Sequence, residues 1–166
     1  ECVVVMIDAS MPIESQDLTL CNLVAQEGRA IVLALSKWDI VEDKQKTLKE
    51  VESKLEDVLP EIRGVPVVTL SAIQERGLDK LLKAAGWAVQ DYKAMNLAAG
   101  RGVADREFPT PTGPMDYMLY VDRRGIGSVE AKKVGETLLG VEPQADRYSE
   151  GFTARAKKAG IPFWKL

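Results

Sequence analysis

The sequence predicts an α/β protein in which a small parallel three-stranded sheet with helices is followed by a second α/β unit. Strands and helices alternate through the first half, which favours a parallel sheet with right-handed crossovers. After about residue 100, the pattern changes to short strands separated by turn residues. The length of 166 residues, with 46% hydrophobic and 28% charged residues, suits one ordinary domain or two very small ones.

The first half contains three apolar runs and three helical patterns. The runs have the continuous apolar character of buried parallel strands. The helices are predicted from apolar residues repeating along one side. The expected strands are Val3–Asp8, Ala30–Ser36 and Val65–Ser71, and the expected helices are Ser15–Glu27, Asp43–Leu59 and Gly77–Asp91.

The second half is predicted to contain a hairpin. The expected strands are Val103–Phe108, Asp116–Val121 and Ile126–Lys132, followed by a helix over Pro143–Lys158 and a further strand from Ile161. The segment from Pro109 to Pro114 is rich in proline and is expected to be a turn-rich break between strands.

Composition excludes several kinds of chemistry. Histidine is absent, which removes Ser-His-Asp and Cys-His catalysis and every His-ligated metal. The two cysteines are too few for a disulfide framework or a zinc site. The apolar runs are too short to cross a membrane and no basic segment precedes the first, so we expect a cytoplasmic protein without a membrane partner.

Charge is distributed unevenly along the chain. Residues 1–80 carry 9 Lys and Arg against 15 Asp and Glu, whereas residues 81–166 carry 13 against 10. The basic balance of the second half favours a polyanionic partner for that half only.

Three charged residues of the second half suit metal-assisted phosphodiester hydrolysis. Glu130 and Lys132 are two apart on a predicted strand and therefore share a face. A three-residue loop, Arg123-Arg124-Gly125 with Gly in the left-handed conformation, would place Asp116 opposite Lys132 and beside Glu130, whereas a loop of even length would point Asp116 away. Asp116 and Glu130 offer oxygen ligands to Mg²⁺, and Lys132 can orient water or neutralise phosphate charge. As a bare spacing this pattern is weak, because such residues are common on exposed strands.

The first half contains residues typical of a nucleotide-binding end of a sheet. Ser36-Lys37-Trp38-Asp39 closes one strand and Ser71-Ala72 closes the next. With Val5-Met6-Ile7-Asp8-Ala9-Ser10 and Gly77-Leu78-Asp79-Lys80-Leu81, these segments resemble the second G domain of Der-family ribosome-assembly GTPases over about residues 1–82. The resemblance implies part of a P-loop-type fold in which Lys37, Asp39, Ser71 and Ala72 contact a guanine nucleotide.

The chain departs from that family in two respects. Ser36 stands where the family has Asn, and neither G-x-x-x-x-G-K-[ST] nor D-x-x-G is present. Without these phosphate-binding motifs, we do not expect GTP hydrolysis. The strand Val3–Asp8 would also lose its usual neighbour and become an exposed apolar edge, through which the chain could self-associate.

The second half carries a more specific resemblance. Gln144 and Tyr148 lie four residues apart on the predicted helix, giving PD-(D/E)xK followed by Q-x-x-x-Y. Together with the segments Ala85–Asp91, Asn96–Ala104, Arg106–Pro109, Val129–Lys133 and Thr137–Gln144, the pattern resembles the nuclease domain of the R subunit of type I restriction enzymes, over about residues 81–166. We therefore expect a GTPase fragment over residues 1–82 and a nuclease domain over residues 83–166.

This resemblance implies a restriction-endonuclease-like fold and a DNA-cutting site. Asp116 and Glu130 would bind Mg²⁺, Lys132 would be catalytic, and Gln144 and Tyr148 would help to hold DNA. In that family the nuclease cuts within a complex that contains a translocase and modification and specificity subunits. No helicase motif is present here, so we expect little specific cleavage by this chain alone.

The two patterns meet inside the predicted helix Gly77–Asp91, which we expect to be continuous. The leading hypothesis is an Mg²⁺-dependent endodeoxyribonuclease core fused to an incomplete GTPase fragment. Two alternatives remain: a GTP- or GDP-binding module without hydrolysis, and an inactive fusion protein whose site residues are vestigial.

Overall fold

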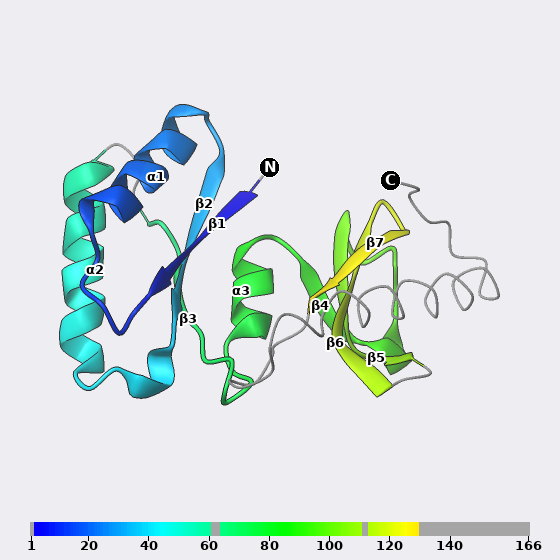
Figure 1. Ribbon diagram of the computed structural model, residues 1–166. Coiled ribbons are helices and arrows are strands. Elements are labelled where there is room, and N and C mark those ends of the chain that lie inside the picture. Colours follow the sequence, from blue (N-terminus) through cyan, green and yellow to red (C-terminus); the bar gives the residue numbers. More distant parts are fainter. Residues whose placement is uncertain (1, 61–63, 111–112, 130–166) are drawn as a thin grey trace. The chain divides into compact units, whose positions relative to one another are not determined.

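The computed structural model describes residues 2–60, 64–110 and 113–129 (Figure 1). The chain divides into two compact units, Glu1–Gly86 and Trp87–Leu166. The first contains a parallel three-stranded sheet with helices, and the second contains a mixed four-stranded sheet. The predicted α/β class is therefore confirmed.

The sheet of the first unit is built around its central strand. Its order is β1 (Cys2–Asp8), β2 (Ala30–Ser36) and β3 (Val67–Thr69), with β2 in the middle and all pairs parallel. Five consecutive residues of β2, from Ile31 to Leu35, are buried. A strand covered on both faces needs apolar side chains at every position, which explains the continuous apolar run.

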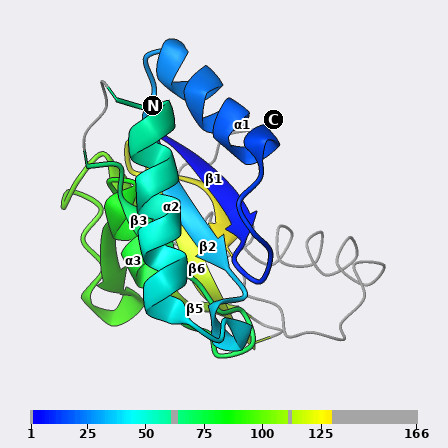
Figure 2. The same cartoon turned by 90° about the vertical axis from the view of Figure 1, so that its left-hand side faces the viewer.

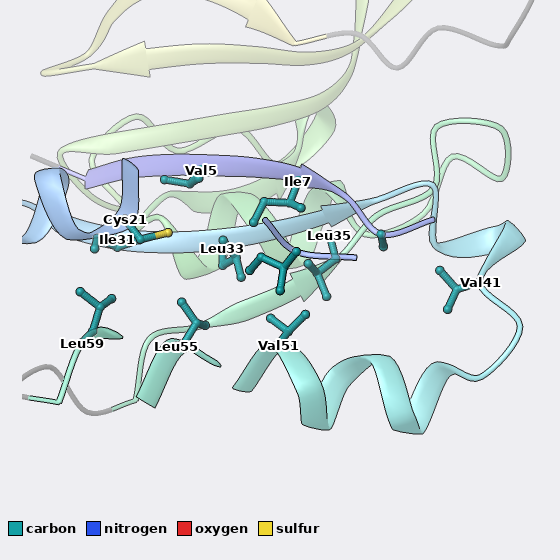
Figure 3. Packing of buried hydrophobic residues seen from close by; sticks show 12 residues of the cluster. Val5, Ile7, Cys21, Ile31, Leu33, Leu35, Val41, Val51, Leu55 and Leu59 are labelled. Atoms are coloured by element: carbon teal, nitrogen blue, oxygen red, sulfur yellow. The ribbon is translucent and has the colours of Figure 1, made fainter. Parts of the chain in front are cut away.

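Helices cover the two faces of this sheet unequally (Figure 2). Helices α1 (Ser15–Gln26) and α2 (Lys44–Val58) pack on the face that carries the odd-numbered residues of β2, such as Leu33. Figure 3 shows their buried side chains meeting those of β1 and β2. Helix α3 (Leu78–Ala84) packs on the opposite face, against Val32, Ala34 and Val68.

Local sequence fixes where the two longer helices begin and end. At α1, the Glu14 side chain and the Asp17 side chain each accept a bond from the other's backbone N–H, which forms a capping box. At α2, the Asp43 carboxylate accepts a hydrogen bond of 3.0 Å from the Lys46 backbone N–H. Helix α2 ends before Leu59-Pro60, since the residue before a proline disfavours the helical conformation.

Helix α3 is shorter than predicted, and the expected continuous helix from Gly77 to Asp91 is wrong. The helix stops at Ala84, and Gly86 takes a left-handed φ of 89°. The Gly86 N–H donates to the Lys83 carbonyl at 3.0 Å, which satisfies a terminal carbonyl. Residues Ala88–Asp91 then form a strand, β4, of the second unit.

Strand β3 is also shorter than its predicted range. It covers Val67–Thr69, because Ser71 turns back and forms an isolated antiparallel bridge with Arg76. The Leu70 N–H still donates to the Leu35 carbonyl at 2.7 Å, so the sheet-like contact with β2 extends one residue past the strand.

Strand β1 lies at the edge of the described sheet and exposes apolar side chains there, as the sequence predicted. Val4 is 38% exposed and Met6 61% exposed, both on the face that α3 covers only over β2 and β3. Among the residues that the structure describes, no helix is long and apolar enough to cross a membrane.

The second unit has the strand order β4-β5-β6-β7. Strand β4 runs parallel to β5 (Gly102–Thr110), and β6 (Gly113–Val121) and β7 (Arg124–Val129) continue as an antiparallel meander. A short 3₁₀ helix, Tyr92–Ala94, follows β4. The core gathers around Val103, Met115, Met118 and Tyr120.

The break predicted between Pro109 and Pro114 is shorter than expected, because β5 and β6 pair as an antiparallel hairpin as far as these prolines. Pro109 lies opposite Pro114, and Thr110 lies opposite Gly113. A proline lacks the N–H that a ladder uses, yet it is tolerated at the end of a strand pair. The proline-rich segment is therefore largely part of two paired strands.

The turn between β6 and β7 also differs from the prediction. Its loop has two residues, Asp122 and Arg123, with φ values of 48° and 65°, and not the three residues Arg123-Arg124-Gly125. Positive φ at both positions is the pattern of a type I′ turn, whose twist matches that of the strands it joins. The register then shifts between Leu119 and Tyr120, where Ile126 is an extra residue on β7.

Gly77 provides a test of close packing between β3 and α3. A Cβ at this position would lie 2.2 Å from the Thr69 carbonyl oxygen, and φ is 98°. Gly77→Ala should therefore lower the free energy of unfolding by more than about 3 kcal/mol, since both strain and a backbone clash result.

Gly28→Ala is the matched control. Gly28 also has a positive φ, of 65°, but an added Cβ would meet nothing within 4 Å. It should cost about 1 kcal/mol, the ordinary penalty of the left-handed conformation. Equal losses in urea denaturation of the two variants would contradict the packing argument.

Candidate functional site

The residues predicted to contact guanine lie together at the carboxyl ends of β2 and β3. Lys37 follows β2 with a left-handed φ of 53°, and Asp39 lies in the 3₁₀ helix Trp38–Ile40. The Trp38 N–H donates to the Leu70 carbonyl at 2.9 Å, which holds this segment against the end of β3. Carboxyl ends of parallel strands are where ligands bind in open α/β sheets.

Asp39 is oriented by Ser71. The Ser71 hydroxyl donates to Asp39 Oδ1 at 2.5 Å, and it also accepts a bond of 3.2 Å from the Gln74 N–H. Ser71 is buried, whereas Ala72 beside it is exposed. Two of the four predicted residues are therefore in direct contact, and the bond leaves Asp39 Oδ2 as a second acceptor.

Lys37 contacts a residue that the sequence analysis did not assign to the site. Its Nζ lies 2.6 Å from Asp8 Oδ2, at the end of β1. Asp8 also accepts bonds from the Ser10 hydroxyl and N–H, at 2.6 and 3.0 Å. The hydrogen bond from Lys37, which has the larger effect, and those from Ser10 lower the pKa of the Asp8 carboxyl group to about 2. Asp8 was recognisable only as the acid that ends an apolar strand.

Ser36, which replaces the family's Asn, has a role between strands. Its hydroxyl donates to the Ile7 carbonyl at 2.9 Å. This bond joins the ends of β1 and β2 and directs the side chain toward the protein backbone.

Of the predicted nuclease residues, Asp116 lies within the described part of the chain. It is a half-buried residue near the start of β6. Glu130, Lys132, Gln144 and Tyr148 lie outside the described residues.

The face on which Asp116 lies follows from the pairing of β6 with β7. Met118 is opposite Ser128, and Tyr117 is opposite Val129. Directly opposed residues share a face, and alternate residues of a strand do so too, so Asp116 lies on the same face as Met118 and Ser128. The two-residue turn alone would give the opposite result, but the bulge at Ile126 reverses the alternation. Within the described residues, Asp116 and Ser128 therefore share a face, but the predicted register is wrong: the three-residue loop would have paired Met118 two residues further along β7 than Ser128.

The described residues do not by themselves form a metal site. Among residues 2–60, 64–110 and 113–129, no three Asp, Glu or Cys side chains are grouped closely enough to hold an ion. Asp116 supplies one carboxylate of the kind that hard cations prefer.

A buried carboxyl group in the second unit was missed by the sequence analysis. Asp105 on β5 is fully buried, and its Oδ1 accepts a 2.7 Å bond from the Gln90 amide on β4. Its Oδ2 and the buried Tyr120 hydroxyl make no hydrogen bond within the described structure. Burial raises the pKa of Asp105, the Gln90 bond opposes this rise, and the charge of Asp91 adds to it. Burial is the main cause of a raised pKa at the Tyr120 hydroxyl, and the charge of Asp105 raises it further.

The only sequence signal for Asp105 was its position. It shares a strand face with Val103, two residues earlier, in a run of three consecutive buried residues that also includes Ala104. A charged residue at an inward strand position is rarely fully buried without a partner.

The fold and these two groups of residues define a nucleotide-binding type of α/β unit followed by a mixed-sheet unit with a buried carboxyl group. Comparison with known proteins agrees with both parts. Residues 1–91 match the family model described as "Elongation factor Tu GTP binding domain". Residues 88–163 match the family described as "Type I restriction enzyme EcoKI endonuclease subunit second domain".

Curated relatives match mainly the first unit. The GTPase Der of Parvibaculum lavamentivorans is 50% identical over 84 residues, which is 51% of this chain and 18% of that protein. The GTPase Der of Roseobacter denitrificans is 52% identical over 84 residues, covering 51% of this chain and 17% of that protein. The GTPase Der of Dinoroseobacter shibae is 40% identical over 138 residues, covering 78% and 28% respectively.

The match to the elongation factor Tu GTP-binding domain family covers residues 1–91, which is more than half of the sequence. The chain therefore belongs to that family. Its first unit is similar to GTPase Der, as predicted, and its second unit matches the restriction-enzyme family, as predicted. The chain spans less than a third of the length of each of the three Der proteins.

Replacing Asp105 by Asn tests the buried carboxyl group. A carboxyl whose folded pKa is raised stabilises the fold most below its unfolded pKa of about 3.9, and this contribution is lost as the pH rises toward the folded pKa. Asp105→Asn keeps the acceptor for Gln90 but cannot ionise. The variant should therefore gain stability relative to the unmodified protein between acid and neutral pH.

The measurement is urea denaturation at several pH values, with Asp57→Asn as the control. Asp57 is an exposed carboxylate of α2 in the first unit, so its replacement should not produce a stability gain that grows with pH. A constant difference between Asp105→Asn and the unmodified protein would contradict the argument.

Proposed function

We propose that the second unit is the core of an Mg²⁺-dependent DNA endonuclease with Asp116, Glu130 and Lys132 as its catalytic group. The observation that carries the proposal is the position of Asp116. It lies on an antiparallel strand, within the segment similar to a restriction endonuclease subunit, on the same face as Ser128 of the next strand. Glu130 and Lys132 follow Ser128 in the sequence at intervals of two.

The residues have separate roles in this proposal. Asp116 and Glu130 supply the carboxylate oxygens that would hold Mg²⁺, which when bound would polarise a phosphate and lower the pKa of water. Lys132 neutralises charge that develops on the phosphate. Gln144 and Tyr148 help to hold the DNA strand. The restriction-enzyme likeness supports a complex with modification and specificity subunits, so sequence choice would not come from this chain.

Cleavage assays test the catalytic group. Incubated with supercoiled DNA and Mg²⁺ or Mn²⁺, the protein should nick DNA without sequence preference, and EDTA should stop the reaction. Lys132→Ala and Asp116→Asn should each reduce the rate by about 100-fold or more, since they remove charge stabilisation and a metal ligand.

Lys93→Ala is the matched control for Lys132→Ala. Lys93 is an exposed cation of the same unit, 5.9 Å from the ring centre of Tyr92. Its removal should leave the cleavage rate within about twofold of the unmodified protein. A metal-dependent rate that survives Lys132→Ala, or no cleavage by the unmodified protein, would contradict the proposal.

A second candidate function is favoured by the Ser71–Asp39 contact. In this proposal the first unit holds a guanine base: Asp39 accepts hydrogen bonds from the base edge, the Lys37 stem lies along its plane, and the Ala72 N–H contacts its oxygen. The absence of the phosphate-binding motifs from the sequence makes binding of the base weaker than in a complete GTPase.

Thermal shift with guanosine and adenosine distinguishes this candidate. Guanosine and GDP, but not adenosine or ADP, should raise the melting temperature. Asp39→Ala should weaken guanosine binding by about tenfold or more, since a hydrogen bond to a charged group contributes about 1.5–3 kcal/mol. Asp57→Ala, which removes an exposed carboxylate of α2, should not. Equal shifts with both nucleosides would rule the base site out.

A further inference from the structure

The sheet of the first unit has two edges that are protected to different degrees. At one edge, β3 is three residues long, follows Pro66 and gives way to the turn that begins at Ser71. At the other edge, β1 has seven residues, from Cys2 to Asp8, without proline, glycine or lysine. Short strands, prolines and lysines are means by which proteins prevent pairing at an edge. Within the described residues, β1 has a partner strand on one side, so its other side is open to a further strand.

The backbone groups that face this open edge belong to the even-numbered residues of β1. The Ala9 N–H donates to the Ser36 carbonyl at 3.0 Å, and the Ile7 carbonyl accepts a bond of 2.9 Å from the Ser36 hydroxyl. The odd-numbered residues of β1 therefore direct their backbone groups toward β2. Because this direction alternates along a strand, Val4 and Met6 direct their N–H and C=O groups away from β2, toward the open edge.

The side chains of the same two residues are apolar and exposed. Val4 is 38% exposed and Met6 is 61% exposed, on the face that α3 covers only over β2 and β3. Asp8, at the end of the strand, is the one charged residue of β1, and its carboxylate lies 2.6 Å from Lys37 Nζ. The open edge therefore offers hydrogen-bonding groups and apolar side chains, and its one charge is compensated.

We propose that β1 pairs antiparallel with β1 of a second copy of this chain, about a twofold axis at Val5. In an antiparallel pair, hydrogen-bonded residues lie directly opposite each other, and here these must be the even-numbered residues. Centring the pair on Val5 aligns all seven residues of β1, with Val4 opposite Met6 and Cys2 opposite Asp8. A pair centred on Val4 or on Met6 would align five residues, so the register at Val5 makes the most hydrogen bonds.

A second copy fits this edge because the pairing is self-complementary. Each exposed Val4 lies opposite an exposed Met6 of the other copy, and Asp8 lies opposite Cys2, so no like charges are opposed. Both copies use the same surface, as in closed twofold dimers. The strand order β3-β2-β1 of one copy continues as β1-β2-β3 of the other. Assembly stops at two copies, because the pairing occupies the open edge of each.

Sedimentation velocity of the full chain under reducing conditions tests the pairing. The unmodified protein should change from monomer to dimer as its concentration rises through about 1 to 100 µM, a range that suits an interface smaller than those of stable dimers. Val4→Lys/Met6→Lys should remain monomeric, because each lysine would lie opposite a lysine of the other copy. Val4→Glu/Met6→Glu should remain monomeric for the same reason. Both positions are exposed, so neither pair of substitutions removes a core side chain.

Mixing the two variants separates edge pairing from a general loss of structure. Lysines would then lie opposite glutamates, so the mixture should form the dimer that neither variant forms alone. The control Ile40→Lys/Ile73→Lys replaces two apolar side chains of the same unit outside β1, 57% and 50% exposed, and should dimerise like the unmodified protein. The proposal is overturned if the unmodified protein stays monomeric or assembles beyond two copies. It is also overturned if the lysine variant dimerises alone, if the mixture stays monomeric, or if the control loses the dimer.

Discussion

Burial of strand β2 on both faces is the constraint on which the first unit depends. Because α1 and α2 cover one face and α3 the other, Ile31 to Leu35 are all buried, and Leu33 and Ala34 are fully so. Because the strand is packed on both faces, the position of its carboxyl end is fixed. Lys37 and Asp39 emerge there, so their contacts with Asp8 and Ser71 are set by the packing of the sheet.

At the carboxyl ends of these strands, the charged side chains of the candidate guanine site contact other residues of the protein. Lys37 is paired with Asp8 at the end of β1, and Asp39 Oδ1 accepts a hydrogen bond from Ser71, which follows β3. The two residues that would contact a guanine base are therefore already oriented by neighbouring side chains. Such orientation lowers the entropy that a ligand contact must overcome. It also serves the fold alone, because each pair joins the ends of different strands.

In the sheet of the second unit, one charged side chain is buried and another is exposed to solvent. Asp105 is buried and bonded to Gln90, where desolvation favours its neutral form. Arg123, in the turn between β6 and β7, is exposed and keeps a left-handed backbone conformation that its side chain does not favour. Between them, the bulge at Ile126 decides which face of the sheet Asp116 shares with β7.

The sequence by itself determined the α/β class, the extent of β2 and both longer helices, because these follow from periodicity and local order along the chain. The end of α3 at Ala84 was not predicted, because the apolar spacing continues past Gly86, the glycine whose left-handed conformation follows the helix. Likewise, the length of the β6–β7 turn and the bulge in β7 together determine the face on which Asp116 lies. The contacts of Lys37 with Asp8 and of Gln90 with Asp105 join residues that are far apart in the sequence. Those contacts exist only once the strands are aligned, so the tertiary structure alone decided them.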